Sequence, residues 1–197
     1  VRYVGYPILA IVAETLEIAE SVAEKIIINY KEFDSVTNIS KAINNKMVSV
    51  RNEVADNISF DWELGNKDEA LRDINSSKYK INIELINNRL VPNPMECRSA
   101  IGAYDDTSDE YTLYCSSQGV HSLKRKLSSI FNKSEDKFHV ITKDVGGGFG
   151  MKIFNYPEYI LSLASSKIIK RPVKWKVSRT ESFLSDIHGR DHFSKAI

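Results

Sequence analysis

The sequence predicts an α+β fold of mixed sheets with packed helices. Strand-type apolar runs alternate with stretches of helical periodicity along the 197 residues, and 42% of the residues are hydrophobic. That content fills an ordinary core, and the length suits one full domain or two small ones.

The first segment is predicted to be a strand, helix, strand unit. Residues 4–13 form a compact apolar run, in two parts around the turn Gly5-Tyr6-Pro7, as expected of a strand. Thr15 suits the N-cap of a following helix, in which apolar residues recur at helical spacing: Ile18, Val22 and Ile26. Residues 27–30 are again predicted to be extended.

A domain boundary is predicted next. Residues 34–57 are rich in Asn, Ser and Lys with scattered hydrophobics, which bury little surface, so we interpret this stretch as a linker. The resulting division is a domain over 1–35, a linker over 36–57 and a second domain over 58–197. Within the last, residues 78–90 alternate in hydrophobicity and predict a half-buried strand.

The remaining elements follow from local pattern. Residues 100–104 and 111–115 predict two strands joined by a polar turn. Residues 120–131 predict a helix with one apolar face, made of Leu123, Leu127 and Ile130. Residues 138–142 predict a strand that runs into a glycine cluster.

The last two elements are a helix and a strand. Residues 156–169 predict a helix with Pro157 in its first turn and an inward face formed by Leu161, Ala164, Ser165 and Ile168. Residues 172–177 predict the final strand.

Composition excludes several functional classes. The 27 Lys and Arg residues nearly balance the 26 Asp and Glu residues, so no nucleic-acid partner is expected. The apolar run 8–13 is far shorter than the roughly 20 residues that cross a bilayer, so no membrane insertion is expected. Two cysteines, Cys97 and Cys115, define no disulfide framework, and a cytoplasmic location is the simplest setting.

The glycine cluster is the first candidate site. Gly146, Gly147, Gly148, Phe149 and Gly150 lie between a predicted strand and a predicted helix, where bare backbone N–H groups and a positive helix end suit an anionic ligand. Known nucleotide motifs fail here, because Met151-Lys152-Ile153 stands where a phosphate-binding loop needs Gly-Lys-Ser/Thr. Two interpretations stay open, a tight turn and a ligand cradle.

Gln118 is the second candidate. It follows a predicted strand, from which its neutral amide could point into the same crevice as the glycine loop and donate a hydrogen bond without adding charge. The alternative is an exposed loop amide. No metal ligand is predicted: His188 and His192 are four residues apart, but Gly189 weakens a helix between them, and neither cysteine has a short-spaced partner.

Six segments, in order along the chain, resemble one family, the xanthine dehydrogenase/aldehyde oxidase family, nearest the carbon monoxide dehydrogenase large-subunit type. They begin with VGYPILAIVA at residue 4, and the others are NRLVPNPME from residue 88, SQGVH from 117, DVGGGFGMK from 144, RPVKW from 171 and RTE from 179. The ending HGRDH from residue 188 is similar to the same branch.

The resemblance implies a fold and a cofactor. Residues 1–35 would be the C-terminal part of an α/β hammerhead domain, and residues 58–197 the N-terminal part of the molybdopterin-binding domain. The cofactor would be molybdenum-molybdopterin in its cytosine dinucleotide form. By this resemblance, cofactor contacts fall on Gly147, Gly148, Phe149 and Gly150, and Gln118 hydrogen-bonds an oxo ligand of molybdenum.

The resemblance also implies hydroxylation chemistry, with electrons leaving through iron–sulfur clusters to FAD. Partners would be a FAD-binding medium subunit, an iron–sulfur small subunit and the remainder of the large subunit, with a homodimer as a further option. The family's glutamate base would lie beyond Ile197, so we expect a fragment that is inactive and free of cofactor alone. The competing hypothesis is a stand-alone binding or structural module that has lost catalysis.

One position bears on the substrate. Purine-oxidising members of the family have Glu directly after the Lys of this glycine-rich motif, whereas this chain has Ile153. An apolar side chain cannot hydrogen-bond a purine. A xanthine substrate is therefore disfavoured, and an aldehyde, another small carbonyl or aromatic compound, or carbon monoxide stays open.

Overall fold

The computed structural model describes residues 1–44, 48–54 and 56–197. These residues divide into two compact units. The first comprises residues 1–28 and 91–189, and the second comprises residues 29–90 and 190–197. The boundaries predicted from sequence at 35 and 57 stay predictions.

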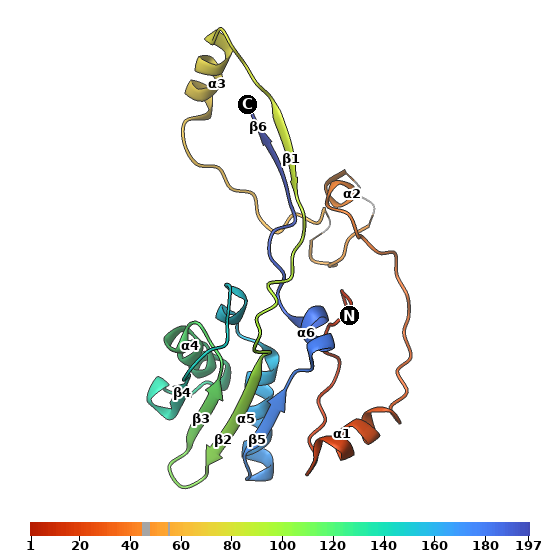
Figure 1. Cartoon of the computed structure of the whole chain (residues 1–197), viewed down its shortest axis with the longest axis vertical. Helices are drawn as coiled ribbons and strands as arrows, with labels where there is room; N and C mark the ends of the chain where they lie inside the picture. The colour runs from red at the N-terminus through yellow and green to blue at the C-terminus, as the bar shows by residue number, and fades with distance from the viewer. Residues whose placement is uncertain (45–47, 55) are drawn as a thin grey trace. The chain divides into compact units, whose positions relative to one another are not determined.

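The first unit is built on a four-stranded mixed sheet (Figure 1). The strands, in the order β4-β3-β2-β5, are β4 (Phe138–Ile141), β3 (Glu110–Cys115), β2 (Ser99–Asp105) and β5 (Val173–Lys176). β2 pairs antiparallel with both β3 and β5, whereas β3 and β4 are parallel. The hairpin, the mixed helix-and-sheet architecture and four predicted strands are confirmed, those over 100–104, 111–115, 138–142 and 172–177.

Two helices close the core of this unit. Helix α4 (Val120–Phe131) packs against β4, and helix α5 (Pro157–Ile169) packs against β2, β3 and β5 (Figure 1). Both supply buried side chains to one apolar cluster, which includes Leu123, Leu127, Tyr159, Leu163, Tyr111 and Leu113. Ile130, expected on the apolar face of α4, is instead exposed.

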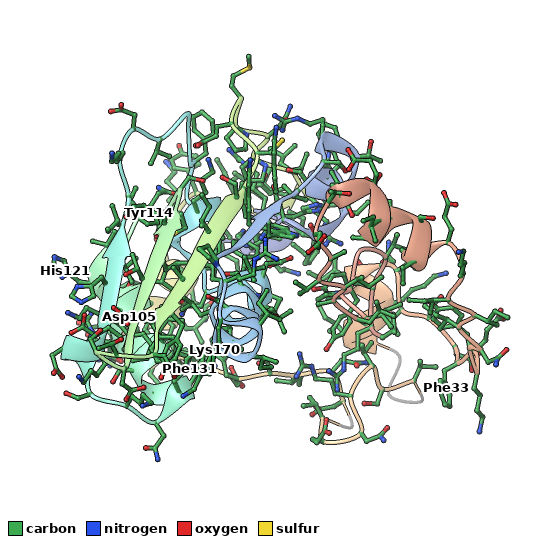
Figure 2. All side chains as sticks on the ribbon, turned by 90° about the horizontal axis from the view of Figure 1, so that it is seen from below. Phe33, Asp105, Tyr114, His121, Phe131 and Lys170 are labelled. Carbon is green, nitrogen blue, oxygen red and sulfur yellow. The ribbon has the colours of Figure 1, made fainter. Side chains whose placement is uncertain are left out.

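An aromatic group fixes the C-terminal end of α4 to the sheet. The Tyr111 ring lies 5.1 Å from the Phe138 ring and 5.0 Å from the Phe131 ring between centroids, distances at which aromatic pairs attract. Figure 2 shows the side chains of this part of the unit, with Phe131 and Asp105, the last residue of β2, labelled. These aromatic contacts hold α4, β3 and β4 together at this end of the sheet.

The inward face of α5 was predicted wrongly in part, since only Ala164 and Ser165 of its four predicted residues are half-buried. Ile168 and Leu161 are exposed, and the buried polar positions are Ser162 and Ser166. The cause is Gly102 in β2, where an added Cβ would lie 2.5 Å from the backbone of Ser162. The helix approaches the strand so closely that small side chains face it, and Ser166 Oγ accepts a hydrogen bond from the Tyr104 N–H at 3.0 Å.

The N-terminal segment holds helix α1 (Leu16–Ala23), with Thr15 as the predicted N-cap accepting from the Ile18 N–H. The strands predicted at 4–13 and 27–30 are absent from the described structure, and Ile8, Leu9 and Ile27 are exposed. An apolar run forms a strand only where another strand supplies hydrogen-bond partners. The described residues provide none here, and Ile26 lies beyond the end of α1.

Sequence reasoning missed helix α6 (Arg179–Ser185). Its signal was present, since Ser178 and Glu181 form a capping box in which each side chain accepts from the other residue's backbone N–H. Two short 3₁₀ turns, Glu135–Lys137 and Met151–Ile153, complete the first unit.

The second unit is sparse. It contains α2 (Ile39–Asn44), α3 (Lys67–Ser76) and an antiparallel pair of β1 (Ile83–Asn87) with β6 (His192–Ala196). All residues of the two strands are exposed, so the half-buried strand predicted over 78–90 is wrong in burial and too long. α2 lies within the predicted linker, of which residues 45–47 and 55 are outside the described part.

None of the helices that the structure describes is long and apolar enough to span a lipid bilayer.

Candidate functional site

The glycine loop lies between β4 and the 3₁₀ turn Met151–Ile153. Its backbone enters the left-handed region at Gly147, Phe149 and Gly150, with φ of 99°, 52° and 85°. Such angles come readily to glycine and rarely to phenylalanine. Helix α5 begins at Pro157, as predicted, and follows the loop in sequence after the 3₁₀ turn.

The central part of the loop offers free backbone donors. The N–H groups of Gly146, Gly150 and Lys152 donate to side chains, and that of Met151 donates to the Gly148 carbonyl at 2.9 Å. Among the described residues, the N–H groups of Gly147, Gly148 and Phe149 have no acceptor. Consecutive free backbone donors are the groups from which proteins build binding sites for an anion or a polar oxygen.

Gln118 fastens one end of the loop. Its Oε1 accepts from the Gly150 N–H at 3.0 Å and the Lys152 N–H at 3.1 Å, and its own backbone N–H donates to the Lys152 carbonyl at 3.0 Å. Two backbone donors on one oxygen fix the orientation of the amide. Nε2 makes no hydrogen bond to another described residue, so it is the group left for a ligand.

Gly148 leaves room for the Gln118 side chain in this packing. A Cβ at that position would lie 2.5 Å from Gln118 Oε1, closer than atoms approach without a shift. The sequence candidates Gln118 and the glycine loop are therefore brought together in one site. Their roles as cofactor contacts stay predictions.

Two charged residues that sequence reasoning left without a role lie beneath the loop. The side chain of Lys152 is fully buried, and its Nζ lies 2.7 Å from Glu96 Oε2. The same carboxylate oxygen accepts from the Gly146 N–H at 2.9 Å, and the Glu96 N–H donates to the Gly146 carbonyl at 3.1 Å. Glu96 thus fastens the other end of the loop.

The charge state of Glu96 follows from these contacts. Desolvation, the largest single influence, raises its pKa, but the hydrogen bonds from Lys152 and Gly146 and the charge of Lys152 together bring the pKa below its ordinary value. A carboxyl group with a lowered pKa is ionised at neutral pH. The Glu96–Lys152 pair is therefore a salt bridge under ordinary conditions.

Arg179 anchors the segment that precedes Glu96. Its guanidinium donates to Asn93 Oδ1 at 2.7 Å and to the carbonyls of Pro94 and Met95, each at 2.8 Å. Pro94 in turn borders the loop, because a Cβ at Gly147 would lie 3.1 Å from it. Four of the sequence motifs thus meet at one corner of the first unit.

The corner also presents apolar side chains. Phe149, at the tip of the loop, is 72% exposed, and Ile153, at the end of the 3₁₀ turn, is 52% exposed. Within the part of the chain that the structure describes, no group of three or more His, Cys, Asp or Glu side chains is arranged to hold a metal ion. The chemistry available here is hydrogen-bond donation from backbone and amide.

A family model described as "Molybdopterin cofactor-binding domain" matches residues 50–196. The chain belongs to this molybdopterin-binding family. The glycine loop, Gln118, Glu96 and Lys152 all lie within the matched range. The resemblance to molybdenum hydroxylases, inferred from the six ordered motifs, is confirmed.

Named relatives agree. The chain is 32% identical over 195 residues to the nicotine 6-hydroxylase large subunit of Paenarthrobacter nicotinovorans, covering 98% of this chain and 23% of the relative. It is 25% identical to the carbon monoxide dehydrogenase large chain of Hydrogenophaga pseudoflava, covering 92% and 24%. A solved structure of a Cu,Mo-CO dehydrogenase is similar with a TM-score of 0.84 and 25% identity, over 90% of this chain and 24% of that one.

The chain thus spans about a quarter of the length of these proteins. The fold over the matched range is that of their molybdenum-cofactor-binding part. The family model begins at residue 50, so the assignment of residues 1–35 to a hammerhead domain stays a prediction.

Proposed function

We propose that this chain forms one wall of the molybdopterin site in the large subunit of a molybdenum hydroxylase. The observation that carries the proposal is the row of three backbone N–H groups, at Gly147, Gly148 and Phe149, that have no acceptor among the described residues. The loop that bears them is fastened at both ends, so the donors are held ready before a ligand arrives.

The residues fit the cofactor in kind. Molybdopterin carries phosphate and heteroatom acceptors, which suit backbone donors at a glycine loop. The absence of side chains at Gly147 and Gly148 lets the loop pack closely on Pro94 and Gln118, which hold it in place. Gln118 Nε2 would add one neutral donor beside the backbone donors, which orients the ligand without bringing a charge or a titrating proton to the site.

When bound, the molybdenum group supplies the oxidation chemistry that carbon hydroxylation requires. The part played by this chain is to bind and orient. The exposed ring of Phe149 and the side chain of Ile153 give the corner an apolar border. Because Ile153 offers no hydrogen bond, we propose a substrate other than a purine, among the aldehydes, small carbonyl or aromatic compounds and carbon monoxide.

The wider assembly belongs to the same proposal. It comprises the cytosine dinucleotide form of the cofactor, the remainder of the large subunit, a FAD-binding subunit and an iron–sulfur subunit, in the cytoplasm. Residues 1–35 would be the C-terminal part of the hammerhead domain. We expect the 197-residue chain to be inactive alone, because the glycine loop is one wall and a complete site needs others.

The test is a pair of glycine variants in the complete enzyme. Gly148→Ala places a Cβ 2.5 Å from Gln118 Oε1, whereas Gly189→Ala meets no atom within 4 Å and has no positive φ. We expect Gly148→Ala to lower molybdenum and pterin content at least tenfold, by displacing the loop and the amide together. Gly189→Ala should retain both. Full cofactor content in Gly148→Ala would remove the loop from the site.

A wild-type complete subunit that carries no molybdopterin would instead favour the module that has lost catalysis. The same measurement on the 197-residue chain checks the expectation of an empty chain. Stoichiometric cofactor bound to that chain would mean that this wall of the site alone is enough to bind molybdopterin.

A further inference from the structure

Lys152 contacts both residues that hold the glycine loop, Gln118 and Glu96. Its main chain forms hydrogen bonds to Gln118 through both the N–H and the carbonyl, at 3.1 and 3.0 Å. Its side chain passes beneath the loop and reaches Glu96, which holds Gly146. The Gln118 end and the Gly146 end of the loop are therefore connected through one residue.

The connection is made by a charge that is out of contact with solvent. The Lys152 side chain is 0% exposed, whereas that of Glu96 is 35% exposed. A buried ammonium group is strongly disfavoured unless it is paired and hydrogen-bonded. Lys152 therefore depends on Glu96 for its partner, and the position of Glu96 relative to Lys152 is tightly set.

We propose that the Glu96–Lys152 ion pair is a positioning device for the glycine loop. It acts through the loop, holding Gly147, Gly148 and Phe149 in the conformation that presents their free N–H groups. This inference rests on the proposed molybdopterin site for its purpose, but the mechanical coupling is a property of the chain itself.

An exposed ion pair provides a matched control. Lys170 Nζ lies 2.6 Å from Asp106 Oδ2, and both side chains are mostly exposed. This pair lies at the end of α5 and the β2–β3 turn, where it makes no contact with the glycine loop. Its loss removes a lysine–carboxylate contact of similar length without disturbing the site.

The decisive measurement is amide hydrogen exchange in the 197-residue chain. Lys152→Met removes the buried charge and retains the main-chain bonds, and the double variant Glu96→Gln/Lys152→Met removes both charges with little change in shape. We expect exchange at the amides of Gly150 and of position 152 to accelerate about tenfold. Both N–H groups bond Gln118 and not Glu96. Gly150 lies outside the substituted residues, so its exchange reports coupling through the loop.

Exchange at Leu113, in the buried strand β3, monitors the whole unit. It should stay as in the wild type, as should every amide named here in Lys170→Met. If exchange accelerated only at the Gly146 amide, the ion pair would affect only the hydrogen bond between Gly146 and Glu96. That result would overturn the proposal. An equal loss of protection at Leu113 would mean a general packing role and also overturn it, and so would unchanged exchange in the double variant.

A second measurement uses the complete enzyme. The double variant should hold several-fold less molybdenum and pterin than the wild type and Lys170→Met. Equal loading together with accelerated exchange would overturn the positioning role toward the cofactor. A wild type without cofactor would instead defeat the proposed function, and the exchange result in the chain would stand by itself.

Discussion

The two units of the chain differ in where their apolar side chains lie. In the first unit, β2, β3, α4 and α5 bury a continuous cluster that includes Leu113 and Leu163. In the second, Ile83, Leu85 and Ile86 of β1 are all exposed. A two-stranded ribbon is at best marginally stable in water. The glycine loop and Gln118 therefore belong to the part of the chain that supplies its own core.

This difference explains why a preorganised site is found in the first unit. A loop can present unsatisfied donors only if its surroundings hold it against collapse onto other acceptors. Glu96, Lys152 and Gln118 provide that support. The ribbon of the second unit has no comparable layer among the described residues.

The largest expected effect comes from Arg98, which ties together β2, α5 and α6. Its side chain is fully buried, with Nε 2.5 Å from Asp186 Oδ1 and NH1 3.2 Å from Glu158 Oε2. Arg98→Met should lower the free energy of unfolding by about 3–5 kcal/mol, because the carboxylate of Asp186 stays buried without its partner. Denaturant unfolding of the chain measures this.

Arg171→Met is the matched control. Arg171 pairs with Glu14 at 3.3 Å with both side chains largely exposed, so the change should cost less than about 1 kcal/mol. Equal effects of the two substitutions would show that the buried network adds nothing to the stability of the first unit.

A smaller effect is expected at Gly102, where α5 meets β2. Gly102→Ala puts a Cβ 2.5 Å from the Ser162 backbone, so the helix must move away from the strand. Overpacking of this kind costs about 1–3 kcal/mol. Gly189→Ala, which meets no neighbour, supplies the baseline. If the two alanine variants unfolded at the same denaturant concentration, the close helix–strand contact would not matter for stability.

The same contact shows why part of the fold escaped prediction. Periodicity located α4, α5 and all four strands of the first sheet, since each buries a patterned face. It placed the inward side of α5 on Leu161, Ala164, Ser165 and Ile168. A helical pattern cannot indicate that Gly102, on another strand, brings the helix closest at Ser162. The predictions of strands at 4–13 and 27–30 were wrong for a related reason. A local apolar pattern does not indicate whether another strand is available to pair with it.

Only part of the candidate site could be predicted from the sequence. Glycines in a row and an amide after a strand are local signals, and they identified the loop and Gln118. The support beneath the loop is non-local, since Glu96 and Lys152 are 56 residues apart. In sequence, each resembles an ordinary solvated charge. Only the fold reveals that Lys152 is buried and that Glu96 is its counterion.

The smallest expected effect lies in the second unit, at Ile86 of β1, which is 73% exposed. Ile86→Ser should change the free energy of unfolding of the 197-residue chain by about 0.5 kcal/mol or less, as exposed substitutions generally do. The same replacement at Leu113, buried in β3, should cost several-fold more, since it removes core contacts and buries a hydroxyl. A large effect of Ile86→Ser in this chain would mean that the ribbon is part of a packed core, and the contrast between the two units would fail. The same substitution can be measured in the complete subunit. If further polypeptide covers the ribbon there, Ile86→Ser should lower the free energy of unfolding by substantially more than in the 197-residue chain. The two measurements together distinguish a ribbon that stays exposed from one that is covered in the complete subunit.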